Sequence, residues 1–418
     1  MKILITGGGI GGLMAALALH RQGHRDVCVL EQAASIQAIG AGVQLAANAT
    51  RVLRHYGLMP QLEQVGVRSL GTWYKDLRTD EMLHRSEAGD WGEATYGAPY
   101  MFVHRKDLQA MLLEALPPGW VRTGAQVQRV QDEGKHASVA LADGTRLTAD
   151  LVIGADGLNS RTREAVVPGI APEFSGVVTW RALIPAEKLR AAGIELEAAC
   201  HDWMGPDRIV AVYWCAGGRL LNLLAAIPAA EPTPESWTTS DASGLLERSF
   251  ADAHPRVKAI LDCIDTPFVT GIFDRPPLET FHRGRIVLLG DAAHPFVPYL
   301  SNGAAQAIED GHVIATVLTR AERGELPLQD ALAEYEQRRR VRVDAVHRLS
   351  RESLHTHHLA DAAAIEQRNA RYRNAQNADP KGSRLREWLW GYDVIADTAR
   401  PLDADIAAAR QIERLPVA

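Results

Sequence analysis

The stretch ILITGGGIGGLMAALALH (Ile3–His20) decides how this chain of 418 residues begins to fold. Residues 2–6 have the pattern of a short buried strand, and residues 11–22 carry apolar side chains at helical spacing. Between them lie the glycines of a G-x-G-x-x-G turn: Gly7, Gly9 and Gly12. Such glycines allow a tight turn, close approach of a pyrophosphate, and close packing of helix on strand. The stretch predicts a dinucleotide-binding turn with a helix N-terminus at the phosphates.

A second strand, Val27–Glu31, follows this helix, so the chain starts as a strand–helix–strand unit of a parallel sheet. Its last residue, Glu31, lies about where a carboxylate that binds ribose hydroxyls is expected. A glycine pattern by itself also occurs in purely structural turns. The combination of strand, glycines, helix and acidic strand end favours the dinucleotide.

A second segment, GRIVLLGDAAHPFVPYLSNGAAQAIEDG (Gly284–Gly311), repeats the strand–turn–helix order and places Asp291 at its turn. Two such elements from distant parts of the chain indicate one long cofactor held from both sides, which favours a flavin over a nicotinamide. The sequence contains no second G-x-G-x-x-G. Any nicotinamide therefore binds without a Rossmann domain of its own.

Composition narrows the class of protein. Apolar residues make up 46%, and the net charge is −6, which gives no reason to expect nucleic acid or an anionic membrane as a partner. The four cysteines show no metal-binding spacing, which favours free thiols in the cytoplasm. No secretory signal follows Met1. The most apolar stretch, 209–228, is broken by glycines and an arginine, and reads as two strands rather than a membrane span.

The remaining sequence alternates between helical and β-rich patterns. Helices are predicted near 48–58, over Val103–Leu116 and through most of the chain after residue 326, and strand-like patterns over 69–100, 147–157 and 176–270. The 147–157 strand runs into a third motif, GADGLNSRTR (Gly154–Arg163). By itself, such an acidic turn with Ser160 and Arg163 is more often a satisfied strand-to-helix cap than a polar clamp.

The three motifs together resemble those of the single-component FAD-dependent aromatic hydroxylases, the class A flavoprotein monooxygenases. The chain is most similar to the group that hydroxylates salicylate, 3-hydroxybenzoate and 6-hydroxynicotinate. The resemblance runs over nearly the whole length. It implies that NAD(P)H, as co-substrate, reduces FAD, that O2 then adds to the flavin, and that a C4a-hydroperoxide hydroxylates a small hydroxylated aromatic or heteroaromatic compound.

The implied fold is α/β, with a Rossmann-like FAD-binding domain interleaved with a β-sheet-rich substrate domain and followed by a helical C-terminal region. The boundaries expected are 1–75, 100–175 and 275–330 for the FAD-binding domain, 76–99 and 176–274 for the substrate domain, and 331–418 for the C-terminal region.

The resemblance also implies a set of cofactor-binding residues. Gln109 is a further candidate beside Arg105. The family often has G-Q-G where this chain has Ser301, Asn302 and Gly303, so the loop there departs from the pattern. The set comprises Gly7, Gly9, Ile10, Gly11, Gly12, Glu31, Gln32, Arg105, Val127, Asp156, Asp291, Pro298, Gly303 and Ala304.

Tyr213 is the candidate catalytic residue, because relatives place a tyrosine at the matching position against the substrate ring. Ile209 occupies the position where relatives often have a histidine base. A tyrosine with a pKa of about 10 is a poor base, so Tyr213 is assigned to hydrogen bonding and positioning. Tight packing at a sheet edge is the alternative. The candidate substrate residues are Gln44, Trp180, Arg181, Tyr213 and Tyr299.

No metal site is expected. His355, His357 and His358 have no metal-binding spacing and lie on what reads as an ordinary helix face. His294 is interpreted as structural. The aromatic stretch EWLWGYD (Glu387–Asp393) is expected to pack back on the body, although a homodimer interface is the alternative.

Two other functions stay open at the level of sequence. One is a flavin monooxygenase that hydroxylates or epoxidises a larger or polycyclic substrate, since Ile209 makes the pocket more apolar. The other is a flavin-binding protein without catalysis.

Overall fold

The computed structural model describes residues 1–35, 41–233, 244–378 and 383–402. A six-stranded sheet has the order β18-β19-β12-β1-β2-β8, and β1 (Ile3–Thr6) pairs in parallel with β2 and β12. The other strands are β2 (Val27–Leu30), β8 (Val121–Arg122), β12 (Leu151–Gly154), β18 (His282–Arg283) and β19 (Ile286–Leu288). The strands that carry the three motifs are therefore neighbours, although they lie far apart in the sequence.

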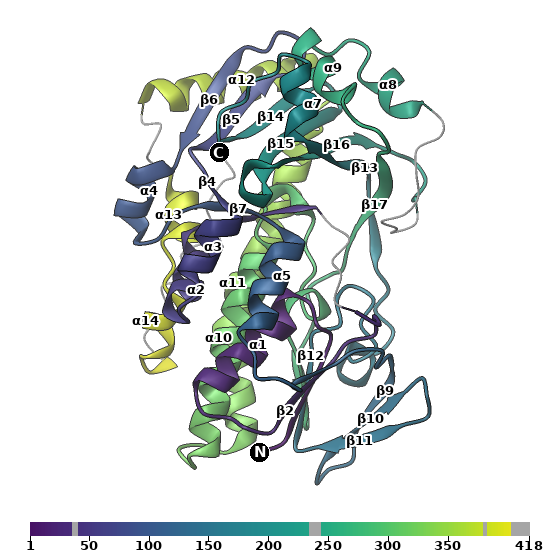
Figure 1. The fold of residues 1–418 in the computed structure, drawn as a ribbon, viewed down its shortest axis with the longest axis vertical. Helices are drawn as coiled ribbons and strands as arrows, with labels where there is room; N and C mark the ends of the chain where they lie inside the picture. Colours follow the sequence, from purple (N-terminus) through teal and green to yellow (C-terminus); the bar gives the residue numbers. More distant parts are fainter. Residues whose placement is uncertain (36–40, 234–243, 379–382, 403–418) are drawn as a thin grey trace.

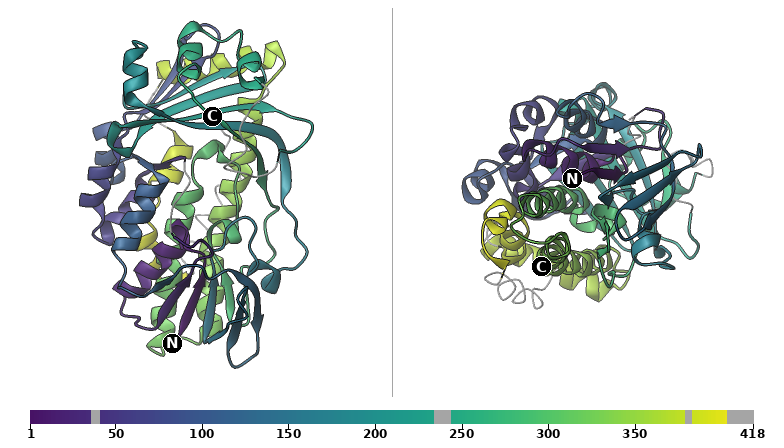
Figure 2. Two further views of the ribbon diagram at one scale, coloured as in Figure 1. Left: turned by 45° about the vertical axis from the view of Figure 1, so that its right-hand side comes forward. Right: turned by 90° about the horizontal axis from the view of Figure 1, so that it is seen from below.

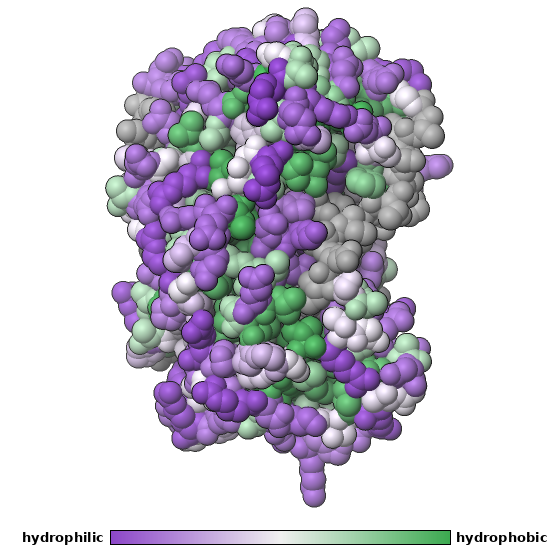
Figure 3. Space-filling model, viewed as in Figure 1, coloured by the Kyte–Doolittle hydropathy of each residue, from purple (hydrophilic) through white to green (hydrophobic). Residues whose placement is uncertain are grey.

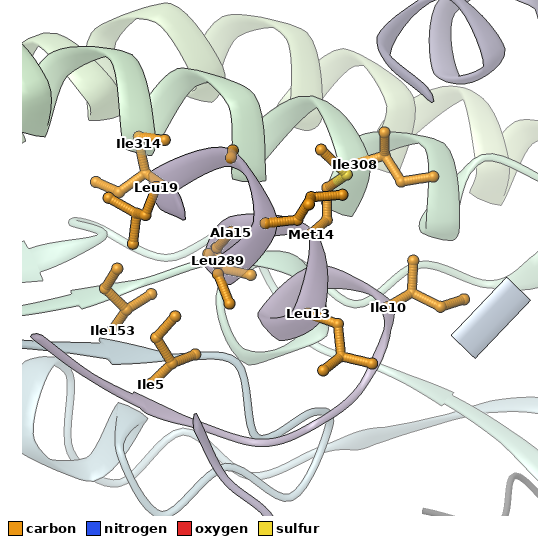
Figure 4. Close-up of a cluster of buried hydrophobic side chains, with 14 of the residues drawn as sticks. Ile5, Ile10, Leu13, Met14, Ala15, Leu19, Ile153, Leu289, Ile308 and Ile314 are labelled. Atoms are coloured by element: carbon orange, nitrogen blue, oxygen red, sulfur yellow. The ribbon is translucent and has the colours of Figure 1, made fainter. Parts of the chain in front are cut away.

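Three helices are stacked on this sheet. Helix α1 (Ile10–Arg21) packs between the sheet and α10 (Gly303–Glu322), and α10 in turn packs on α11 (Leu328–His357). Figure 4 shows the apolar side chains at this contact, with Leu13, Met14 and Leu19 of α1 close to Ile308 and Ile314 of α10 and to the strand residues Ile5 and Ile153. The predicted Rossmann-like strand–helix–strand start is confirmed.

A seven-stranded sheet has the order β17-β13-β16-β15-β14-β5-β6 and lies at the other end of the molecule (Figures 1 and 2). Helices α7 (Ala186–Ala191), α8 (Leu245–Ser249) and α9 (Pro255–Leu261) supply residues to the core on one of its faces. Its strands are β5 (Gly71–Asp76), β6 (Met82–Glu87), β13 (Glu173–Pro185), β14 (Cys200–Gly205), β15 (Arg208–Cys215), β16 (Leu220–Pro228) and β17 (Phe268–Asp274).

The structure corrects the prediction that Trp180 lines the substrate pocket. Trp180 is fully buried in the core beside Val210 and Val212, whereas its neighbour Arg181 lines the cavity described below. Successive side chains of a strand point to opposite faces, so Trp180 and Arg181 of β13 cannot both face the same pocket.

Shorter elements connect the two sheets. One three-stranded sheet contains β3 (Gly42–Leu45), β7 (Met101–His104) and β4 (Val67–Arg68), and the other contains β11 (Arg146–Ala149), β10 (Ala137–Leu141) and β9 (Val127–Asp132). The helices here are α2 (Ala47–His55), α3 (Met59–Val65), α4 (Gly89–Tyr96), α5 (Arg105–Glu114) and α6 (Arg163–Val166). Two sequence predictions were wrong in detail: Val103 belongs to a strand, and 69–100 contains α4.

The C-terminal part is helical, as predicted, with α11, α12 (Ala362–Ala378), α13 (Arg384–Trp390) and α14 (Val394–Thr398). The stretch Glu387–Asp393 packs on the body: Arg342 donates to the carbonyl oxygens of Trp388 and Leu389, and the Trp390 ring contacts Tyr100 with centroids 4.9 Å apart. Residues 403–418 of the expected C-terminal region lie outside the described residues.

On the face drawn in Figure 3, hydrophobic side chains are scattered among hydrophilic ones. Within the described residues, no helix has both the length and the apolar character needed to cross a membrane.

Candidate active site

The glycine turn after β1 is built from close backbone contacts. Gly7 has φ +100°, and a Cβ on Gly12 would lie 2.0 Å from the carbonyl oxygen of Gly7. Neither position can therefore take a side chain without displacing the turn. Gly9 differs, because a Cβ there would have no neighbour within 4 Å. The open space beside the Gly9 backbone, at the N-terminus of α1, is where a pyrophosphate would be expected to lie.

Glu31 closes the turn from the neighbouring strand end. Its two carboxylate oxygens accept hydrogen bonds from the backbone N–H groups of Gly8 and Ala33, each at 2.8 Å. Gln109 donates to the carbonyl oxygen of Gly8 at 2.6 Å. The carboxylate expected to bind ribose is thus held in place by the glycine turn itself.

Asp156 of the middle motif holds the loop that precedes α6. Its carboxylate accepts from the hydroxyl of Ser160 at 2.5 Å and from the backbone N–H groups of Arg161 and Thr162. Arg163, which is 1% exposed, donates to the carbonyl oxygens of Leu158 and Ala292. The middle motif therefore ties its own loop to the segment GDAAHP (Gly290–Pro295). A direct role for Asp156 at the cofactor stays a prediction.

A buried ionic network supports the GDAAHP segment. The Asp310 carboxylate of α10 accepts from the backbone N–H of Gly290 at 2.8 Å and bonds His294 Nε2 at 2.7 Å. Arg339 of α11 donates to Asp310 at 2.6 Å and to Glu309 at 2.6 Å. His294 thus has the structural role that the sequence predicted for it.

This network makes the stability of the folded protein depend on pH. Burial alone would raise the pKa of Asp310, but the charges of His294 and Arg339 outweigh it and lower the pKa from 3.8 to about 2. A carboxyl whose folded pKa lies below its unfolded value stabilises the protein above the unfolded pKa, and that contribution is lost as the pH falls towards the folded one. We expect about 2 kcal/mol of unfolding free energy to disappear between about pH 5 and pH 2 from this group. Urea unfolding across this range should show a shallower pH slope for Asp310→Asn, and equal slopes would contradict the assignment.

Where the sequence departs from the family pattern, the loop before α10 has a backbone conformation that favours glycine. Ser301 has φ +51° and ψ +33°, the left-handed conformation that glycine adopts most easily. A glycine at this position in relatives therefore fits the same loop geometry. Asn302 and Gly303 follow at the start of α10, whose first turn faces the cavity with the positive end of a 20-residue helix.

One cavity of about 950 Å³ joins the glycine turn to the seven-stranded sheet. It is lined at the cofactor end by eight predicted residues: Gly9, Ile10, Gly11, Arg105, Asp291, Pro298, Gly303 and Ala304. Four predicted substrate residues also line it: Gln44, Arg181, Tyr213 and Tyr299. The predicted cofactor residues outside this lining are Gly7, Gly12, Glu31, Gln32, Val127 and Asp156.

The far wall of the cavity contains a row of side chains that runs across the seven-stranded sheet. Strand register places one residue from each of six neighbouring strands side by side, and all six line the cavity: His84, Tyr74, Asp202, Ala211, Leu224 and Arg181. The Tyr372 ring of α12 stacks on Tyr74 with centroids 4.7 Å apart. This wall offers flat aromatic faces together with a few polar groups, as expected for a small-molecule site.

Tyr213 lies where β15 meets β3 and β7. Its ring packs against Phe102 with centroids 4.9 Å apart, and burial raises the pKa of Tyr213 well above its usual value of 10. Ile209 precedes Tyr213 by four residues on β15, so it lies on the same face of the strand, and it lines the same cavity. Tyr213 is therefore suited to donating a hydrogen bond and unsuited to accepting a proton near neutral pH.

Sequence analysis missed Asp202 and His357. Asp202, 8% exposed, has Oδ2 3.2 Å from His357 Nε2, while its Oδ1 is buried with no hydrogen-bond partner in the described structure. His358, whose pKa is lowered to about 4 by burial, bonds the Tyr299 hydroxyl at 2.6 Å. Asp202 gives the cavity a buried hydrogen-bond acceptor. Alternation from Cys200 along β14 was a signal that could have indicated its direction.

Metal ligation finds no support in the described residues, where no group of three His, Cys, Asp or Glu side chains is placed to hold a metal ion. The geometry does fit a long dinucleotide. The open backbone at Gly9 and the N-terminus of α10 belong to one continuous cavity, so a pyrophosphate and a flavin ring can be held from the two segments together. This fold and this site define a dinucleotide-binding flavoprotein.

Comparison with known proteins gives the same result. Residues 1–350 match the family described as the FAD binding domain. The chain is 37% identical to 3-amino-4-hydroxybenzoate 2-monooxygenase PtmB3 of Streptomyces platensis, over 94% of this chain and 96% of that protein. It is 34% identical to 6-hydroxynicotinate 3-monooxygenase of Pseudomonas fluorescens, over 94% and 95%. The crystal structure of Klebsiella pneumoniae HpxO complexed with FAD and uric acid has the same fold as this chain, with a TM-score of 0.79 and 24% sequence identity. The match covers all of this chain and 98% of the HpxO chain.

The chain belongs to the FAD-binding-domain family and, within it, to the flavin-dependent monooxygenases. FAD is its cofactor. The resemblance inferred from the three sequence motifs is confirmed.

Proposed function

We propose that this protein uses NAD(P)H and O2 to hydroxylate a small hydroxylated aromatic or heteroaromatic acid. The observation that supports this most is the single cavity, which begins at the glycine turn and ends at an aromatic wall. The relatives named above act on aminohydroxybenzoate and hydroxynicotinate. FAD, when bound, supplies the reduction by NAD(P)H and the activation of oxygen.

The chain's own residues would bind, orient and shield the reactants. We assign FAD binding to the fourteen cofactor residues predicted above, with Glu31 at the ribose and Asp291 near the second segment. Tyr213 would position the substrate ring by donating a hydrogen bond. Gln44, held by the Tyr100 hydroxyl, and Tyr299, held by His358, would fix the substrate from two further sides. The buried aromatic wall would keep bulk water from the reacting atoms.

The organisation proposed here keeps the predicted division into an FAD-binding domain, a substrate domain and a C-terminal region. Cys28, Cys200, Cys215 and Cys263 are free thiols, which supports a cytoplasmic location. Assembly as a homodimer stays a prediction.

The proposal is tested with the FAD-loaded protein and the acids named for its relatives. We expect 3-amino-4-hydroxybenzoate or 6-hydroxynicotinate to accelerate NAD(P)H oxidation and to yield a product that carries one oxygen atom from labelled dioxygen. Acceleration only by larger fused-ring compounds would favour the polycyclic alternative. Tight FAD binding with no acceleration by any ligand would favour a non-catalytic flavin protein.

A further inference from the structure

Helix α13 places a buried cation at the cavity. Arg386 is 6% exposed and lines the cavity together with Ser86, Tyr100 and Trp390. Its guanidinium lies over the Trp390 ring, 4.8 Å from the centroid, and donates to the hydroxyl of Ser86 and to the carbonyl oxygen of Glu87. These contacts tie α13 to strand β6 and fix the position of the charge.

Within the described part of the chain, Arg386 has no carboxylate partner for its charge. Among the described residues, no ion pair within 4.0 Å involves Arg386, whereas Arg339 and Arg342, which are also buried, both pair with Glu309. Burying a guanidinium without an anion costs several kcal/mol. Burial lowers the pKa of Arg386, while the carboxylates around Arg339 outweigh burial and raise the pKa of that residue. An anion that enters the cavity would compensate this buried charge, so binding of an anion there is favoured.

Other buried arginines without carboxylate partners do not share this position. Arg163 and Arg368 are each 1% exposed and are satisfied by carbonyl or amide oxygens, but neither lines the cavity. Arg386 has five N–H donors, and the contacts to Ser86 and Glu87 in the described part of the chain use two of them. Donors thus remain for a further acceptor.

The surroundings of Arg386 suit an aromatic ring that carries the anion. His84 lies in the same wall, and burial together with the Arg386 charge lowers its pKa to about 4, so it is neutral and does not compete for an anion. Tyr74 and Tyr372 stack beside it with an interplanar angle of 23°. A planar ring can lie against these faces while its substituent reaches the guanidinium.

We propose that Arg386 binds the carboxylate of the aromatic substrate, which makes this residue of α13 a determinant of specificity for aromatic acids over neutral phenols. This inference rests on the proposed function, since it names the group by which the same site recognises its substrate. Guanidinium and carboxylate form paired charge-assisted hydrogen bonds, which are the strongest contacts this cavity can offer to such a ligand.

The test uses matched ligand pairs that differ only in the carboxylate: 3-amino-4-hydroxybenzoate and 2-aminophenol, 6-hydroxynicotinate and 2-hydroxypyridine, salicylate and phenol. Each is titrated into the FAD-loaded protein, and binding is followed by the change in flavin absorbance. We expect the wild-type protein to prefer the acid in at least one pair. Arg386→Met should weaken acid binding by about 10- to 100-fold, the loss of a charge-assisted hydrogen bond, and leave the neutral partner within about twofold.

Two further variants separate recognition from loosening of α13. Ser86→Ala removes one of the contacts that hold the helix but keeps the cation, so the preference for the acid should remain. Arg386→Lys keeps a charge but loses the planar fork, so acid binding should fall between wild type and Arg386→Met. Equal loss of both ligands in Arg386→Met, or the same loss in Ser86→Ala, would overturn the proposal.

The failure of this inference is distinguishable from failure of the proposed function. If no acid binds wild type more tightly than its neutral partner, Arg386 is not a carboxylate anchor, even when ligands still accelerate NAD(P)H oxidation. If acid preference depends on Arg386 but no ligand accelerates NAD(P)H oxidation, the anchor stands and the catalytic proposal fails.

Discussion

Replacing Arg339 by methionine is expected to lower the free energy of unfolding by about 3–5 kcal/mol. Arg339 is completely buried and bonds two carboxylates, Glu309 and Asp310, at 2.6 Å each. Methionine fills similar space but leaves both acids facing a neutral group. The cost is that of uncompensated buried charge, which exceeds the value of the ion pair itself.

Urea unfolding of the FAD-loaded and FAD-free proteins measures this effect. The matched control is Arg323→Met, because Arg323 lies at the exposed end of α10 with its nearest carboxylate, Glu325, 4.0 Å away. That change should alter stability by less than about 0.5 kcal/mol. A loss below about 1 kcal/mol for Arg339→Met would show that the buried acids take up protons at little cost.

The network also links stability to the site. Asp310 holds both Gly290 and His294 of the GDAAHP segment, and Arg163 holds the same segment through Ala292. Loss of Arg339 should therefore weaken FAD binding as well as folding, since Asp291 lies in the segment that Asp310 and Arg163 position and Pro298 follows shortly after it. Neither Asp310, which anchors this loop, nor Glu309 lines the cavity.

Local features of the site were accessible from the sequence. The turn at Gly7 and Gly12, the strand that ends at Glu31, and the alternation of Ile209 with Tyr213 all depend on residues within one or two elements. Trp180 was wrongly assigned although alternation along β13 excludes pairing it with Arg181. The apolar ring of Trp180 was interpreted as part of the pocket, although burial in the core was the simpler interpretation.

Features that depend on contacts between residues far apart in the sequence could not be predicted in the same way. Arg386 meets Ser86 across 300 positions of sequence, and Asp202 faces the cavity only because β14 pairs with β5 and β15 in one register. A shift of that register by one residue would reverse every side chain of the strand. Hydrophobic periodicity does not specify which strands pair. Alternation could therefore indicate on which face of β14 Asp202 lies, but not what that face meets, and the sequence carries no signal for the position of Arg386.

Gly12→Ala is expected to destabilise the protein by about 3 kcal/mol or more and to abolish FAD binding. The added Cβ would lie 2.0 Å from the carbonyl oxygen of Gly7, a backbone atom that cannot move without opening the turn. Gly9→Ala is the matched variant. Gly9 has φ −75°, and its Cβ would meet nothing within 4 Å, so the FAD-free protein should keep its stability.

The two alanines therefore separate folding from binding at the same turn. In Gly9→Ala the methyl group enters the space beside the backbone that a pyrophosphate needs, so FAD affinity should fall while the unfolding of the FAD-free protein is unchanged. In Gly12→Ala the unfolding temperature should drop with and without FAD. Flavin fluorescence titration and thermal unfolding measure both quantities. Normal FAD affinity in Gly9→Ala would mean that the pyrophosphate lies elsewhere, whereas normal stability in Gly12→Ala would mean that the turn relaxes around a side chain.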